Sequence, residues 1–222
     1  AGADRIELCS ELAVGGITPS YGLLKKVRER VQIPIHVLIR PRSGDFTFSD
    51  DEFNVMKMNI EVCKELGFDG IVSGALHSDY SLDQKGTKEL IEATGDMIFT
   101  FHRAFDWVKD PYKTLEELEI LGVDYILSSG QNTAAPLGLD LLCKLQQHAK
   151  HCTVMPGSGI NELNVNQFKD KGFKVVHLSA ARYANTIDGE PKVSMNSASF
   201  LHDNGVMISN QTIISSVVNA VK

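Results

Sequence analysis

Ionisable residues stand at the end of an apolar segment in FTFHRAFD, residues 99–106. A run with strand character stops there in His102, Arg103 and Asp106. Burying such groups without partners costs free energy. Their position therefore indicates a site where a buried strand emerges into a loop, as in a binding or catalytic pocket.

Side-chain alternation brings further polar groups to the same place. The bulkiest apolar residues of each segment are assigned to the side that packs on helices, so the alternate residues point inward. The inward residues with polar or thiol groups are Glu7, Cys9, His36, Arg40, Thr100, His102, His177 and Ser179. The residues expected around this mouth are Arg42, Asp45, Arg103, Asp106 and Arg182.

Glu7 and Arg40 are expected to form an ion pair. They belong to consecutive apolar segments, and neighbouring strands lie about 4.8 Å apart. An inward carboxylate without a partner costs several kcal/mol. The alternative is that inward charged groups only fill the interior of the fold. Several ionisable groups at the carboxyl ends of strands favour a functional site.

These residues predict two parts of a site. The predicted catalytic residues are Glu7, Arg40, His102, Arg103 and Asp106. The predicted phosphate- or anion-binding residues are Arg42, Gly157, Ser158, Gly159, Ser179 and Arg182. Glycines in MPGSGI, residues 155–160, can expose backbone N–H groups to a phosphate. Arginines in RPRSGDF, residues 40–46, can clamp an anion. Tight-turn glycines and solvated arginines without a ligand are the alternative.

Cys9 is the candidate metal ligand. Its thiol is expected beside Glu7, and a soft thiolate suits Cu(I). An inward cysteine is also a common packing residue. The histidines His148 and His151 match no metal-ligand motif.

A repeating pattern of strands and helices must position these groups. Seven apolar segments begin at residues 5, 33, 68, 97, 123, 152 and 174, separated by stretches with helical spacing. A (β/α)₈ barrel uses about 31 residues for each unit, which fits this spacing. We therefore predict an α/β TIM barrel, a single domain over residues 1–222, with a polar loop at 183–207 before the last helix.

The count of seven strands is one short of a full barrel. The opening Ala-Gly-Ala-Asp resembles the end of a helix, so the first strand is expected upstream of Ala1. An open seam is then expected between RIELCS and KVVHLSA. A doubly wound open sheet is the alternative, but its Gly-rich fingerprint after the first strand is absent.

Composition limits the classes of partner. Lys and Arg number 22 and Asp and Glu number 28, a net charge of −6, which argues against nucleic acid and against a polybasic membrane surface. The four cysteines are widely spaced and contain no CxxC pair, which favours a reduced, cytoplasmic protein.

Taken together, the motifs resemble one family. GADRIELCS, GGITPS, RPRSGDF, TFHRAFD, SSG and MPGSGI, in this order, are similar to the copper-homeostasis protein CutC family from Ala1 to about Arg182. The resemblance implies a cytoplasmic (β/α)₈ barrel that forms homodimers or higher oligomers. It also implies Cu(I) binding through two cysteines, of which Cys9 matches one. The other belongs to the first strand.

Two functions are consistent with these observations. The first is Cu(I) binding or trafficking through Cys9. The second is an enzyme acting on a small phosphorylated or carboxylated metabolite, with His102 and Glu7 in acid–base roles and Arg40 and Arg103 stabilising charge. Arginines with a glycine-rich turn suit an anion better than a cation.

Overall fold

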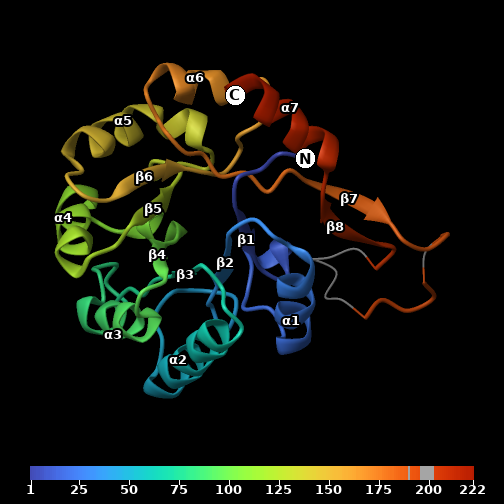
Figure 1. Ribbon diagram of the computed structural model, residues 1–222, viewed down its shortest axis with the longest axis horizontal. Helices are drawn as coiled ribbons and strands as arrows, with labels where there is room; N and C mark the ends of the chain where they lie inside the picture. The colour runs from blue at the N-terminus through green and yellow to red at the C-terminus, as the bar shows by residue number, and fades with distance from the viewer. Residues whose placement is uncertain (190, 196–202) are drawn as a thin grey trace.

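A curled sheet of six parallel strands forms the body of the protein (Figure 1). The computed structural model describes residues 1–189, 191–195 and 203–222. The strands lie side by side in sequence order. They are β1 (Ile6–Leu8), β2 (Ile35–Leu38), β3 (Gly70–Ser73), β4 (Ile98–Phe101), β5 (Tyr125–Ser128) and β6 (Thr153–Pro156). This order and direction confirm the α/β barrel-type fold.

Helices follow the strands and pack around the outside of the curled sheet (Figure 1). The α-helices are α1 (Tyr21–Arg30), α2 (Asp50–Glu65), α3 (Gln84–Thr94), α4 (Pro111–Leu121), α5 (Leu139–His148), α6 (Val165–Asp170) and α7 (Gln211–Val221). The short 3₁₀ helices are η1 (Leu12–Val14), η2 (Arg103–Trp107) and η3 (Ala135–Gly138). Described residues contain no helix long and apolar enough to cross a membrane.

Local sequence signals explain where the helices begin and end. Ser49 accepts a hydrogen bond from the backbone of Glu52, and the Glu52 carboxylate accepts one from the backbone of Ser49, so α2 starts with a capping box. Helix α4 begins at Pro111 and ends at Gly122, whose φ of 85° suits glycine. These ends set the loops that carry the polar residues.

Side-chain alternation holds on the central strands. Val37 and Phe99 are fully buried and do not line the cavity inside the sheet, whereas His36 and Leu38 do line it. On β1 both faces contact the cavity, because β1 is an edge strand and Ile6 and Leu8 border the opening as well. Ile6 and Leu8 nevertheless lie in register with Ile35 and Val37 and pack against the apolar core, as expected for outward residues.

The seventh expected strand is reduced to one bridge. Within KVVHLSA, His177 forms a parallel bridge with Gly157, and its N–H donates to the Pro156 carbonyl at 2.8 Å. The described sheet therefore remains open between this segment and β1. Helix α7 lies along the open side, where Lys222 pairs with Asp4 at 2.6 Å (Figure 1).

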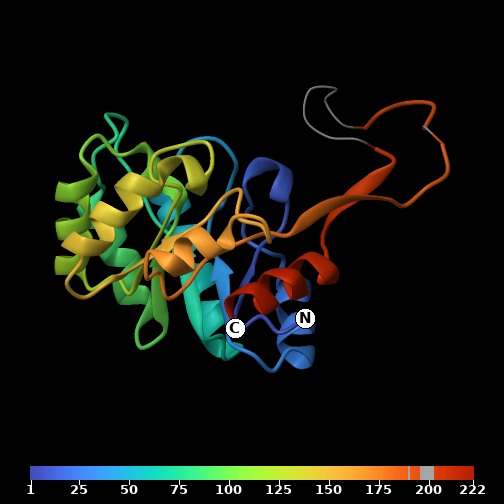
Figure 2. The ribbon, with the colours of Figure 1, turned by 90° about the horizontal axis from the view of Figure 1, so that it is seen from above.

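The expected polar loop at 183–207 contains regular structure. Strands β7 (Ala181–Asn185) and β8 (Gly205–Ser209) pair as an antiparallel hairpin that projects from the body (Figure 2). Valine, isoleucine, methionine and tyrosine in these strands favour pairing, which corrects the loop prediction. The parts of the predicted loop at residues 190 and 196–202 lie outside the described residues.

Candidate functional site

One cavity collects most of the polar groups that the sequence analysis singled out. It lies inside the curled sheet and measures about 2880 Å³. Its walls include Glu7, Cys9, Arg40, His102, Arg103, Ser158, Gly159, His177 and Ser179. Its volume exceeds that of an ordinary ligand pocket, roughly 300–1,000 Å³, because it includes the open side between β1 and the segment around His177.

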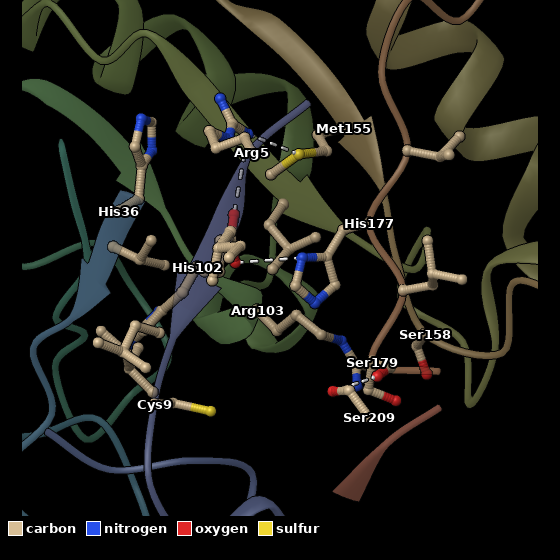
Figure 3. A pocket seen from close by; sticks show the side chains of 18 of the residues that line it. Arg5, Cys9, His36, His102, Arg103, Met155, Ser158, His177, Ser179 and Ser209 are labelled. Carbon is tan, nitrogen blue, oxygen red and sulfur yellow. Dashed lines mark hydrogen bonds and ion pairs between the residues drawn. The ribbon is translucent and has the colours of Figure 1, made fainter. Parts of the chain in front are cut away.

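An ion pair joins the two sides of that opening. Glu7 Oε2 on β1 lies 3.2 Å from His177 Nδ1 (Figure 3). Burial acts to raise the pKa of Glu7, but His177 outweighs it, with help from Arg5, and holds the pKa below its usual range. Burial acts to lower the pKa of His177, but the Glu7 carboxylate raises it above the usual value. The pair therefore favours a carboxylate and an imidazolium.

The expected ion pair between Glu7 and Arg40 is not formed. Parallel register places Glu7 opposite His36. Arg40 follows four residues later, which is about 13 Å along an extended chain at ~3.3 Å per residue. Adjacent strands bring together residues at the same register, and the sequence alone did not provide the register.

Arg40 instead binds backbone carbonyls from two loops. Its side chain donates to Val14 O at 2.8 Å, Gly16 O at 3.0 Å and Gly44 O at 2.7 Å. Only 5% of Arg40 is exposed, and its Nε has no partner among the described residues. Arg40 also forms no ion pair with any of the described residues. The cavity wall therefore holds a buried positive charge without a carboxylate partner.

His102 is a buried neutral imidazole. Its Nδ1 accepts a hydrogen bond from the Ala104 N–H at 3.3 Å, which assigns the ring proton to Nε2. The Nε2 atom has no partner within the described residues. Burial and the positive charge of Arg40 lower the pKa of His102 to about 3. The ring of this cavity-lining residue therefore carries an uncharged N–H donor that is buried and unpaired within the described residues.

His36 is a second buried imidazole, which the sequence analysis placed inward without assigning it a role. It is fully buried against Gly70, where an added Cβ would lie 2.6 Å from the ring. Both ring nitrogens lack a partner in the described structure. Burial, followed by the charge of Arg5, lowers its pKa to about 4.

Asp106 organises the loops beside Arg103. Its carboxylate accepts hydrogen bonds from the Ser128 hydroxyl at 2.7 Å, the Ser129 N–H at 2.9 Å and the Gln131 N–H at 3.2 Å. It also pairs with Arg103 Nε at 2.8 Å. Arg103 Nη2 donates to Ser129 Oγ, and Nη1 has no partner among the described residues. This network holds the Arg103 guanidinium between Asp106 and Ser129 at the cavity wall.

The predicted anion-binding residues divide into two groups. Ser158, Gly159 and Ser179 line the cavity, and the Gly159 N–H has no hydrogen-bond partner in the described residues. The Gly157 N–H is already used, since it donates to the Ser128 carbonyl at 2.9 Å.

Two predicted arginines lie outside the cavity. Arg42 contacts Glu52 at 2.5 Å and Asp45 at 3.1 Å, which holds it at the start of α2. Arg182 is exposed on β7, because the chain leaves the body as a hairpin after Ala180. Neither arginine lines the cavity.

Cys9 is a free cysteine on the cavity wall. Burial raises its thiol pKa, and the Glu7 carboxylate adds to the effect. The described residues contain no group of three or more His, Cys, Asp or Glu residues placed to hold a metal. The sulfur of Met155 contacts Arg5 at 3.2 Å, away from Cys9 (Figure 3). Cys9 therefore presents one thiol at the cavity wall.

Comparison with known proteins gives a consistent result. The sequence profile of the CutC family matches residues 1–182. A CutC family protein from Edwardsiella ictaluri is 47% identical over 180 residues, covering 81% of this chain and 72% of that protein. One from Pectobacterium atrosepticum is 44% identical over 186 residues, covering 84% and 74%. The crystal structure of a candidate copper homeostasis protein CutC from Streptococcus agalactiae matches with TM-score 0.76 and 33% identity, covering 79% of this chain and 88% of that chain.

Proposed function

This chain belongs to the CutC family, and we propose that its cavity binds a small phosphorylated or carboxylated metabolite and acts on it by acid–base chemistry. The observation that carries the proposal is Arg40, a buried guanidinium with carbonyl partners and no carboxylate in the described structure. A buried charge without an ion-pair partner is costly, and an anionic ligand in the cavity would compensate it.

Other groups on the wall support an anion in the same place. Arg103 Nη1 and the Gly159 N–H are donors without partners in the described residues. Both residues line the cavity. Charged and backbone donors of this kind bind phosphate or carboxylate oxygens. Arg103 makes the direct contact in this proposal, and Arg40 contributes its charge from behind.

The chemical step uses two of the three histidines that line the cavity, His102 and His177. His177 is the proton-transferring group, because its side chain is 30% exposed and Glu7 holds its Nδ1. Its Nε2 is then directed to the ligand. His102 donates a hydrogen bond from Nε2 to an oxygen of the substrate as charge develops there, as an uncharged imidazole can. Asp106 is a positioning residue for Arg103.

The first prediction concerns His177→Asn. Wild-type protein in D₂O is incubated with phosphorylated and carboxylated metabolites, and NMR follows consumption of each compound or exchange of its C–H protons. We expect at least one compound to react, and the rate to fall 10²- to 10⁴-fold in His177→Asn, the usual contribution of a general acid or base. His151→Asn, a surface change, is the control. Equal rates in His177→Asn and wild type would exclude the role of His177.

Cu(I) binding at Cys9 is a second candidate function. It is supported by a free thiol on the cavity wall and by the description of the Streptococcus agalactiae relative. Cu(I) prefers soft thiolate ligands. In this proposal Cys9 supplies one thiolate, and the thiol of a copper carrier supplies the other during transfer of the ion as cargo.

Titration with Cu(I) in the presence of a competing chelator tests this candidate. One equivalent of Cu(I) is expected to bind wild type and Cys143→Ala, in which a cysteine outside the cavity is changed. Binding should be lost in Cys9→Ala. Retention of the same affinity in Cys9→Ala would contradict the site.

A further inference from the structure

A single tryptophan stands at the cavity beside the proposed anion site. Trp107 is the only tryptophan in the chain and closes η2, the short helix that also carries Arg103 and Asp106. Its side chain lines the cavity although Trp107 is 47% exposed. Ligand pockets are lined mainly by apolar and aromatic side chains beside a few polar groups, and tryptophan is enriched where partners bind.

Two aromatic neighbours contact Trp107 in T-shaped geometry. Phe46 lies 4.9 Å away at an interplanar angle of 70°, and Tyr80 lies 6.4 Å away at 72°. Both contacts are T-shaped, so neither of these rings is stacked on the indole face. With 47% of Trp107 exposed at the cavity, the planar ring of a ligand can approach the indole.

Phe46 connects this aromatic group to the charged wall. Its ring lies 5.0 Å from the Arg40 guanidinium and 4.8 Å from the His102 ring. Trp107, Phe46, Arg40 and His102 thus form one continuous surface in the cavity. A ligand whose anionic group is held near Arg103 can place an attached ring on Trp107 at the same time.

The loop that carries Tyr80 is held in an unfavourable conformation. Tyr80 has φ of 66°, which costs about 1 kcal/mol or more for a residue with a side chain. The Tyr80 N–H donates to His77 O at 2.9 Å, and Asp79 pairs with Lys109 at 3.4 Å, two residues after Trp107. These contacts hold Tyr80 beside the indole.

We propose that the ligand is an aromatic-ring anion, a small phosphate monoester or free carboxylate whose planar ring stacks on Trp107 while its anionic group contacts Arg103, with the charge of Arg40 behind it. This inference rests on the proposed function, since it names the substrate class of the same cavity. Stacking of a nucleic-acid base on an aromatic side chain is worth about 1–3 kcal/mol, or roughly five- to 150-fold in affinity.

The inference can be tested with two probes that differ only in the presence of a ring. Adenosine 5′-monophosphate and ribose 5-phosphate carry the same sugar phosphate, and phenyl phosphate supplies a smaller ring. Isothermal titration measures their affinities for the full chain. Fluorescence of the single tryptophan reports contact directly. We expect a ring-bearing probe to bind at least tenfold more tightly than ribose 5-phosphate and to quench Trp107 emission.

Variants separate stacking from folding. Trp107→Leu should lose that tenfold preference while ribose 5-phosphate binds as before, and Trp107→Phe should keep most of it. Tyr21→Leu, an exposed aromatic on α1 outside the cavity, is the matched control. Equal affinity for the ring-bearing probes and ribose 5-phosphate, or an unchanged preference in Trp107→Leu, would overturn the stacking inference but not the proposed function. Failure of all three phosphates to bind would overturn the proposed function with it.

Discussion

Lowering the pH from 7 to 5 is expected to reduce the free energy of unfolding by several kcal/mol, because His36 and His102 are buried as neutral imidazoles. Their pKa values in the folded protein are about 4 and about 3. In the unfolded chain a histidine takes up a proton near pKa 6.5. Between pH 7 and pH 5 the unfolded state therefore binds more protons than the folded state, and the free energy of unfolding decreases as the pH is lowered.

The expected size follows from proton linkage. Each of the two histidines contributes about 2 kcal/mol between pH 7 and pH 5, so together they contribute about 4 kcal/mol. His177 acts in the opposite direction. Its raised pKa gives stability that is fully present below its unfolded-state pKa and is lost as the pH rises through its folded-state value. The net decrease is therefore smaller than the sum of the two contributions.

Urea unfolding of the wild type and of the double variant His36→Leu/His102→Asn at the two pH values measures this effect. In His102→Asn the new amide oxygen can still accept the hydrogen bond from the Ala104 N–H. The double change therefore removes the titration of both histidines while keeping that hydrogen bond. The variant should show a pH dependence weaker by about 4 kcal/mol. His148→Asn, on the surface, should behave as wild type. An equal pH dependence in the double variant would show that the two histidines are not buried as neutral groups.

Arg40→Met is expected to have the second large effect. The change removes hydrogen bonds to three carbonyls, and bonds to a charged group contribute about 1.5–3 kcal/mol each. Loss of the buried charge offsets part of this, because an unpaired guanidinium no longer has to be desolvated. If the loops open in the variant, water can hydrogen-bond to the freed carbonyls and offset part of the lost bonding. We therefore expect a net decrease of about 2 kcal/mol in unfolding free energy.

The same unfolding measurement on Arg40→Lys provides the comparison. Lysine keeps the charge but cannot span Val14, Gly16 and Gly44 with a planar fork. Arg40→Lys should therefore lose about as much stability as Arg40→Met, and proteolysis should cut both variants faster within residues 11–16. Wild-type stability in both variants would contradict the role of Arg40 in joining the loops.

Much of the fold could be predicted because its signals are local. Strand spacing, glycines such as Gly122 after helices, and side-chain alternation depend on residues close in sequence. The hairpin at β7 and β8 was missed because its strands are separated by residues 186–204, so no short turn signal links them. The reduced seventh segment was missed because its apolar pattern does not report whether a neighbouring strand completes a ladder.

Only part of the site could be predicted for a similar reason. Alternation placed Glu7, Arg40, His102 and His177 toward one cavity, and all four line it. Their pairing depends on strand register, so the carboxylate of Glu7 meets His177 rather than Arg40. Trp107 was overlooked because one exposed tryptophan in a sequence has no periodic signal. Its position became informative once Phe46 and Arg40 were seen beside it.

Isothermal titration of wild type and Arg40→Met with ribose 5-phosphate tests the central claim most directly. A buried guanidinium compensated by a bound anion predicts binding to the wild type that weakens at least thirtyfold in Arg40→Met, since removing one partner of a buried charge pair costs about 2–5 kcal/mol. Equal affinity in the two proteins, or no binding to either, would contradict the account of this cavity as an anion site.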